Sequence, residues 1–186
     1  SLYQVGPGLF TANALPPYES WEKFGPVVRD GVRALLASRP RGEEAKDFLS
    51  ASLRYIDAFR DDHTGGRDIH SFMQEVMGIE VNVPDSVTKN LAPGATLVPV
   101  LQLQVPMRDG LVMSLSIGQG MWNGSVSIMM DTSVSTTLPI QASEGALMAA
   151  FDSGHASIRE TFFGLMGKIM HVMPPKAKAA QCRWPP

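Results

Sequence analysis

Hydrophobic residues recur every three or four positions near the start of the chain, which is the spacing of one face of an α-helix. The repeat begins near Tyr18 and contains Trp21, Phe24, Val28, Val32 and Leu35 or Leu36. Gly25 and Pro26 interrupt it, because a proline inside a helix removes a backbone hydrogen bond and clashes with the preceding turn. We therefore predict a helix over residues 18–36 with a kink or a restart at Pro26.

A second and longer helical repeat lies near the end of the chain. Ser143 and Glu144 are typical of a helix start, and Pro174-Pro175 would stop the helix. At 1.5 Å per residue this helix would be roughly 40 Å long, enough to cross a whole sheet. Its apolar stripe consists of Leu147, Phe151, Ile158, Phe162, Leu165, Ile169 and Val172 or Met173.

Between the two helices, apolar and polar residues alternate with the period of two that a half-buried strand requires. The pattern predicts strands at 3–14, 48–59, 97–105, 111–117 and 125–131. We expect a break or bulge at 6–8, a hairpin turn at 107–110, and a glycine-rich connection over 118–124. Residues 61–67 and 79–95 are predicted as loops. Asp68 is expected to cap a short helix that Gly78 ends.

These elements predict an α+β fold, with an antiparallel sheet of about five strands packed on one face by the first helix and the long C-terminal helix. We expect residues 1–175 to form a single domain and residues 176–186 to form a flexible C-terminal tail. Strands 3–14 and 97–105 are possible sheet edges, and an edge strand can pair with another chain.

Composition narrows the function classes. The net charge of −2 gives no electrostatic reason to expect nucleic acid or an anionic membrane as a partner. Cys182 is the one cysteine, so no disulfide can form within the chain and a reducing compartment is suitable. No apolar run approaches the roughly 20 residues that span a bilayer, and no signal-peptide layout is present. We expect a cytoplasmic protein without a cofactor.

His155 is the most prominent candidate for a functional side chain. It falls on the apolar stripe of the long helix, where a histidine must find a partner or remain neutral. We favour a satisfied core histidine that orients the helix. The alternative is an acid, base or ligand contact in a pocket.

Arg54 and Asp57 share one predicted strand but are three residues apart, so they point to opposite faces. A structural salt bridge is the interpretation that we favour for Arg54, which lies on the serine-rich face. Capture of an anion by its guanidinium is the alternative.

Carboxylates and imidazoles gather at residues 61–70, and both groups are ligands for zinc, iron or manganese. The members are Asp61, Asp62, His63, Asp68 and His70. Their spacing matches no compact metal template, so we favour a solvated loop with a helix cap and predict no metal site.

Motifs of common enzymes are missing from the sequence, which has no Gly-x-Ser-x-Gly elbow and no phosphate-binding Gly-Lys-Ser/Thr loop. A curved sheet that packs against a long helix often leaves a cavity for a small molecule. Candidates to line it are Met113, Trp122, Met129, Met130, Phe151 and His155.

Five short motifs together suggest a family. They are Val5-Gly-Pro-Gly-Leu-Phe, Tyr18-x-x-Trp21-x-x-Phe24, Leu53-Arg-Tyr-Ile-Asp57, a strand ending in Asp131, and His155-x-x-Ile158-x-x-x-Phe162. In this order the chain resembles a sporadically distributed bacterial family of uncharacterised proteins over nearly its whole length. The chain differs from the family at Asp57, where the family has Asn. The family also has sequence upstream of the position of Ser1, which implies that this chain is a trimmed fragment or a short member. The resemblance implies architecture and no established activity.

Three functions remain open. We favour a non-enzymatic interaction module, accessory to a mobile defence or toxin-neutralising system, whose partner is another protein or a second copy of the chain. The second is a protein that binds a small apolar ligand between the sheet and the long helix. The third is an enzyme whose site combines His155 with Arg54 or Asp57. For the binding of a ligand, Trp122 is a further candidate beside these three residues.

Overall fold

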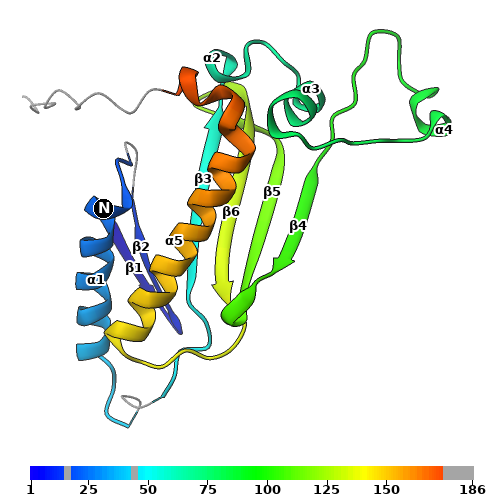
Figure 1. Ribbon diagram of the computed structural model, residues 1–186. Coiled ribbons are helices and arrows are strands. Elements are labelled where there is room, and N and C mark those ends of the chain that lie inside the picture. The colour runs from blue at the N-terminus through cyan, green and yellow to red at the C-terminus, as the bar shows by residue number, and fades with distance from the viewer. Residues whose placement is uncertain (15–17, 43–45, 174–186) are drawn as a thin grey trace, which may run out of the picture. The chain divides into compact units, whose positions relative to one another are not determined.

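The computed structural model of the chain describes residues 1–14, 18–42 and 46–173 (Figure 1). These residues form two compact units, each built from separate segments of the chain. Unit 1 consists of Ser1–Leu53, Met107–Val112 and Val134–Ala156, and unit 2 consists of Arg54–Pro106, Met113–Ser133 and the chain from Ser157. The expected single domain stays a prediction. The expected tail at 176–186 lies outside the described residues, as does Pro174-Pro175.

A β-hairpin opens unit 1, where one interrupted strand was predicted. Strand β1 (Leu2–Gly6) pairs antiparallel with β2 (Leu9–Asn13) as a separate two-stranded sheet. Gly8 has φ +71°, which a glycine after Pro7 adopts at low cost in a tight turn. Of the predicted break or bulge, the break is therefore confirmed and the bulge is wrong, because the turn reverses the chain.

Helix α1 (Trp21–Ala37) packs on this hairpin. The hydroxyl of Tyr3 donates to the carbonyl of Val27 at 2.5 Å, and the rings of Tyr3 and Phe10 stack 5.7 Å apart. Gly31 lies directly beneath both rings and is buried. The helix runs without a restart through Pro26.

The main sheet has four antiparallel strands in the order β3-β6-β5-β4 (Figure 1). Their bounds are β3 Ser52–Phe59, β4 Leu101–Pro106, β5 Leu111–Trp122 and β6 Ser125–Thr136. Strand β3 starts later than predicted, and before it only Phe48 forms an isolated bridge, to Ile140. Strands β5 and β6 are longer than predicted, because Asn123 and Gly124 alone make the turn. Both have positive φ, as the type I′ hairpin turn requires.

Short helices of unit 2 follow β3. They are α2 (Asp61–Thr64), α3 (Ile69–Phe72), the π-helix η1 (Met73–Met77) and α4 (Asp85–Thr88). The carboxylate of Asp68 accepts a hydrogen bond from the N–H of Ser71 at 2.8 Å, which confirms the predicted cap. Gly78 ends the helical segment with φ +71°, also as predicted. The segments predicted as loops contain the helical turns α2 and α4, because single turns leave no apolar repeat to read.

The long C-terminal helix is present as α5 (Glu144–Met166), which continues into the 3-10 helix η3 (Gly167–Val172). The hydroxyl of Ser143 accepts from the N–H of Ala146 at 3.2 Å, so the predicted helix start is confirmed. A further 3-10 turn, η2 (Arg108–Gly110), joins β4 to β5. Within the described residues, no helix is both long enough and apolar enough to cross a bilayer.

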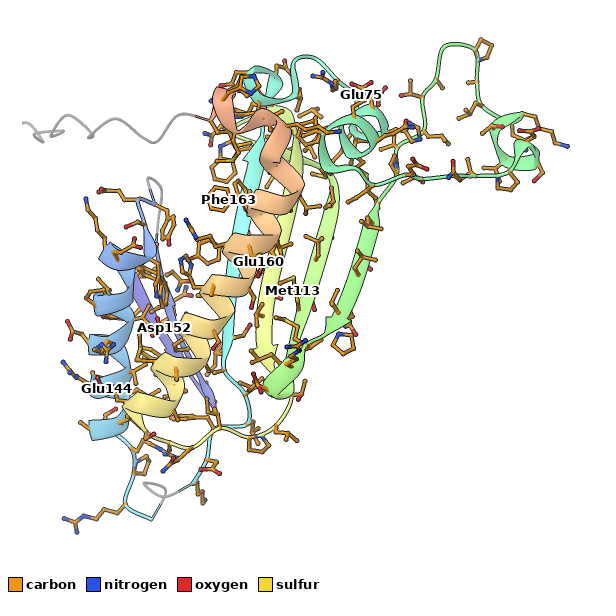
Figure 2. The ribbon with its side chains drawn as sticks, viewed as in Figure 1. Glu75, Met113, Glu144, Asp152, Glu160 and Phe163 are labelled. Atoms are coloured by element: carbon orange, nitrogen blue, oxygen red, sulfur yellow. The ribbon has the colours of Figure 1, made fainter. Side chains whose placement is uncertain are left out.

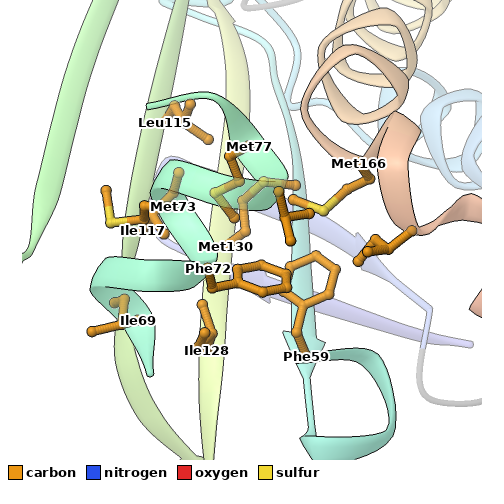
Figure 3. Packing of buried hydrophobic residues seen from close by; sticks show 12 residues of the cluster. Phe59, Ile69, Phe72, Met73, Met77, Leu115, Ile117, Ile128, Met130 and Met166 are labelled. Atoms are coloured by element: carbon orange, nitrogen blue, oxygen red, sulfur yellow. The ribbon is translucent and has the colours of Figure 1, made fainter. Parts of the chain in front are cut away.

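Figure 3 shows the hydrophobic core of unit 2, in which side chains from α3, η1, α5 and η3 pack on the inner face of the sheet. Methionine fills much of it, in line with its ability to fill irregular gaps. The members are Phe59, Ile69, Phe72, Met73, Val76, Met77, Leu115, Ile117, Ile128, Met130, Met166 and Ile169.

The α+β class, the antiparallel sheet and the long final helix are thus confirmed. The strands are divided four and two between separate sheets, and α1 contacts the two-stranded one.

Gly31→Ala tests the contact between α1 and the hairpin. A Cβ at this position would lie 2.6 Å from Tyr3 Cε1 and 2.8 Å from Phe10 Cζ, so the hairpin must shift. We expect a loss of about 1–3 kcal/mol in the free energy of unfolding, measured by urea titration. The control is Gly164→Ala in α5, which meets open space and should be neutral or stabilising. Equal effects of the two variants would contradict the described packing.

Candidate interaction surface

Strand β4 is an edge of the four-stranded sheet, which confirms the possible edge predicted at residues 97–105, although the strand begins only at Leu101. Its one neighbour in the sheet is β5 (Figure 1). An edge strand presents a row of unpaired backbone N–H and C=O groups, to which another strand can bind.

The hydrogen-bond ladder fixes which residues of β4 present these groups. The N–H of Met107 donates to the carbonyl of Leu111 at 2.9 Å across the turn between β4 and β5. Hydrogen-bonded and non-hydrogen-bonded pairs alternate along an antiparallel ladder. The odd-numbered residues of β4 therefore direct their backbone polar groups to β5, and those of Gln102 and Gln104 point away from the sheet.

Side chains of β4 are more exposed than those of β5. Leu103 and Val105 lie on the face that carries the buried Met113 and Leu115 of β5, since inward and outward positions alternate along a strand. Nevertheless Leu103 is 43% exposed and Val105 is 46% exposed. Only Leu101 at the start of the strand packs against the core. The edge thus combines free backbone groups with uncovered apolar side chains.

Charge is absent from the sequence around this edge. Residues 90–107 contain no Asp, Glu, Lys or Arg and no His. Many proteins protect an exposed edge from pairing by placing charged side chains, especially lysine, on it. Strand β4 lacks that protection, although Pro99 and Pro106 restrict pairing at its two ends.

The β1–β2 hairpin of unit 1 is a second uncharged strand pair. Residues 1–18 have no charged side chain, and Val5 at 78% and Leu9 at 64% are among the most exposed apolar residues described. Its solvent face carries its own polar ladder, in which Asn13 Nδ2 donates to Thr11 Oγ1 at 2.9 Å. The hairpin is a separate sheet of two strands, whereas β4 is the edge of the four-stranded sheet, so we take β4 as the candidate surface.

Arg54 occupies the serine-rich face of β3, as predicted, where it pairs with Asp131 of β6. Its Nε donates to Asp131 Oδ1 at 2.8 Å, and its Nη2 donates to Asp131 Oδ2. The hydrogen bonding of the guanidinium to this carboxylate raises the pKa of Arg54 above its ordinary value. The two groups satisfy each other in the bidentate geometry that an anion would otherwise use, so the favoured salt bridge is the arrangement found.

The structure does not bring Arg54 and Asp57 together. Arg54 is exposed on one face of β3 and Asp57 is half-buried on the other. Trp122 lies at the end of β5 beside the Asn123-Gly124 turn and is 36% exposed.

His155 belongs to unit 1 and stacks on a tryptophan of α1. The ring centroids of His155 and Trp21 are 5.4 Å apart, and the interplanar angle is 18°. Trp21 Nε1 also donates to Asp152 Oδ1, one helical turn earlier on α5, at 2.8 Å (Figure 2). Trp21 is buried, so it anchors α1 to α5 through one hydrogen bond and one ring contact. This arrangement agrees with a histidine that orients the helix.

The acidic and imidazole side chains at residues 61–70 make local structural contacts. The N–H of Arg60 donates to His63 Nδ1 at 3.3 Å, which is part of the capping of α2. His63 Nδ1 also lies 3.2 Å from Asp62 Oδ1. His70 Nε2 lies 3.4 Å from the carbonyl of Val81. Among the residues that the structure describes, no group of three His, Cys, Asp or Glu side chains is placed to hold a metal ion.

An open recess of about 400 Å³ lies in unit 1, between the end of the sheet and α5. Among the described residues, Asp109 is the one ionisable side chain that lines it, and Ala149 and Ala150 of α5 form part of its wall. None of the six residues predicted to line a cavity lines this recess. The remaining wall consists of Gly110, Leu111, Thr136, Leu138, Pro139, Ile140 and Ser153.

Besides the predicted edge position, the sequence contains a second indication that β4 is an interaction surface. The charge-free run at residues 90–107 can be read directly, but it is informative only once the strand is known to lie at an edge rather than in the middle of a sheet. The recess had no such signal, because its wall comes from a turn, a loop and a helix that are distant in sequence.

Comparisons with protein-family models, with curated proteins and with solved structures found no match. The family resemblance of the five motifs stays a prediction. Any function proposed for this chain therefore rests on its own geometry.

Glu144 provides a test of the contact between α1 and α5. It accepts from Arg33 Nε and from Arg29 Nη1, each at 2.8 Å, and these bonds hold the pKa of its carboxyl below the ordinary value. A lowered folded-state pKa adds stability above the unfolded pKa of about 4.3, and this stability is lost as the pH falls through the folded pKa. We expect Glu144→Gln to unfold more readily than the parent at pH 7, with a difference that shrinks as the pH falls below about 4.3.

Thermal unfolding between about pH 2.5 and pH 7 measures this difference. Glu160→Gln, at an exposed position of the same helix (Figure 2), is the matched control. A difference that stays constant over the whole pH range would show that the ion pairs do not stabilise the fold.

Proposed function

We propose that this chain is a non-enzymatic protein-interaction module, which binds an extended segment of a partner protein along strand β4. The observation that carries the proposal is an exposed sheet edge without any charged side chain. In this mode of recognition the backbone supplies the hydrogen bonds, and alternate side chains supply the specificity.

The chemistry of the edge defines the segment that it would accept. Gln102 and Gln104 supply both the outward backbone groups and an uncharged polar face. Leu103 and Val105 supply an apolar face on the other side of the strand. The bound segment is therefore an uncharged strand that alternates apolar and polar residues, since a buried charge without a partner is costly.

Other features support binding rather than catalysis. The side chains that were candidates for an enzyme site make structural contacts: Arg54 pairs with Asp131, and His155 stacks on Trp21. The expected role beside a mobile defence or toxin-neutralising system rests on the family resemblance and stays a prediction.

A second candidate function is the binding of a small molecule, which the recess in unit 1 favours. Its volume of about 400 Å³ falls within the usual range for ligand sites. The wall is mainly apolar, although it includes Asp109, and so would suit a small, mainly apolar ligand.

Site-specific photo-crosslinking in cells tests the interaction module. A photoreactive amino acid at Gln102 should give an adduct of defined mass, because the side chain lies beside the bound strand. The same residue at Glu160, exposed on α5, should give no such adduct. Leu103→Lys in the Gln102 variant should abolish the adduct, since it places an unpaired charge on the apolar face of the edge.

Folding does not confound this test, because Leu103 is 43% exposed and Leu103→Lys should leave the thermal midpoint nearly unchanged. No adduct at Gln102, or equal adducts at Gln102 and Glu160, would contradict the proposal.

Native mass spectrometry of the protein purified gently from its own cells tests the small-molecule function. We expect a mass increment of a few hundred daltons that is lost on denaturation. Ala149→Trp should remove the increment by filling the recess. Ala156→Trp, at an exposed alanine of the same helix that does not line the recess, should retain it. A bare protein, or an increment that survives Ala149→Trp, would contradict binding at this place.

A further inference from the structure

We propose that the segment bound by β4 is the β4 strand of a second copy of this chain, paired antiparallel about a twofold axis that passes through Leu103. The inference rests on the proposed function and names its partner. Such pairing would join two four-stranded sheets into one continuous sheet.

The sequence of the strand is nearly the same in both directions. Residues 101–105 read Leu-Gln-Leu-Gln-Val. Antiparallel pairing about Leu103 places Leu103 opposite itself, Gln102 opposite Gln104, and Leu101 opposite Val105. Apolar side chains then meet on the core face and amide side chains meet on the polar face. Directly opposed pairs of this kind are the units that stabilise a sheet.

The direction of the backbone groups agrees with this register. Gln102 and Gln104 point their N–H and C=O groups away from β5, as the Met107 to Leu111 bond requires. In the proposed register they form two hydrogen-bonded pairs, one on each side of the axis. Leu103 falls in the non-hydrogen-bonded pair between them, where opposed Cα atoms are about 4.5 Å apart. A register shifted by one residue would place an apolar side chain opposite each Gln.

The absence of charge and the position of Pro106 at the end of β4 agree with the same register. Two identical strands repel each other when they carry charge, but residues 90–107 carry none. Pro106 has no N–H to donate, so it ends the ladder after Val105. The symmetric pairing needs only residues 101–105 and therefore lies within the limit that proline sets.

The second copy would cover apolar side chains of β4 that are exposed in the single chain. Leu103 and Val105 are nearly half exposed on the face whose next strand holds the buried Met113 and Leu115. A neighbouring strand with the same pattern would extend this apolar face and shield it from water. An interface of one short strand pair is small, so we expect a weak dimer whose population depends on concentration.

Cysteine crosslinking tests the register. In a Cys182→Ser background, Leu103→Cys should form a disulfide-linked dimer on mild oxidation, because its Cα atoms would lie within the roughly 4.4–6.8 Å that a disulfide spans. Val105→Cys is the matched control on the same strand. It faces Leu101 of the second copy and lies about four residue steps, or roughly 13 Å, from its own counterpart, so it should not crosslink. Equal crosslinking of the two variants would overturn the register.

Sedimentation equilibrium tests the dimer itself. We expect the parent to form dimers as the concentration rises, and Gln104→Pro to raise the dissociation constant by roughly tenfold or more. Gln104→Pro removes an N–H that points away from β5, so the chain's own ladder and its thermal midpoint should be preserved. A parent that stays monomeric over a roughly hundredfold range of concentration would overturn self-pairing.

The photo-crosslink at Gln102 distinguishes failure of the self-pairing proposal from failure of the proposed function. An adduct of twice the chain mass supports the second copy. A monomeric protein with an adduct to a different protein overturns self-pairing but retains the interaction module. A monomeric protein without an adduct overturns both.

Discussion

The two-residue turn at Asn123-Gly124 sets the register on which much of the sheet depends. Positive φ at both residues matches the right-handed twist of the flanking strands, and so allows β5 to return directly as β6. A slip of one residue would move every side chain to the opposite face. The turn thus places Met113, Leu115 and Ile117 of β5 on the inner face. The preceding turn, closed by the hydrogen bond from Met107 to Leu111, determines which backbone groups of β4 face outward.

Charge is distributed unevenly along the chain, and this distribution separates structural contacts from the candidate surface. Ion pairs of two carboxylates join elements that are far apart in sequence: Glu144 links α5 to α1, and Asp131 links β6 to β3. The β4 edge and the β1–β2 hairpin have no charged side chains. An uncharged edge is a hazard for a protein that has no use for it, because it pairs with other strands without discrimination. Its presence is more easily understood if a partner normally covers it.

Prediction from the sequence succeeded where a local pattern was long or chemically specific. The stripe from Leu147 to Ile169 identified α5, and Asp68 identified a helix start, because both signals lie within a few turns of chain. It failed where one residue's conformation outweighed the pattern. Gly8 turns a predicted strand into a hairpin, and Asn123-Gly124 confines the predicted glycine-rich connection to two residues.

The candidate site was predictable only in part. Alternation and Pro99 indicated that β4 could be an edge, and the faces of Arg54 and Asp57 followed from the strand period. Their partners could not be derived, since the contact of Arg54 with Asp131 and that of His155 with Trp21 join segments far apart in sequence. The recess escaped prediction for the same reason.

The interleaving of the two units bears on how the chain folds. Unit 1 needs Ser1–Leu53 together with Val134–Ala156, so its contacts close a loop that contains most of unit 2. Closing a long loop costs chain entropy before any distant contact compensates for it, and folding is slower when contacts are far apart in sequence. A ribosome that releases the chain from its N-terminus would expose the β1–β2 hairpin and α1 well before α5 is made. During synthesis α1 is therefore without its partner α5, and a chaperone would find the apolar, charge-free hairpin beside α1 to bind.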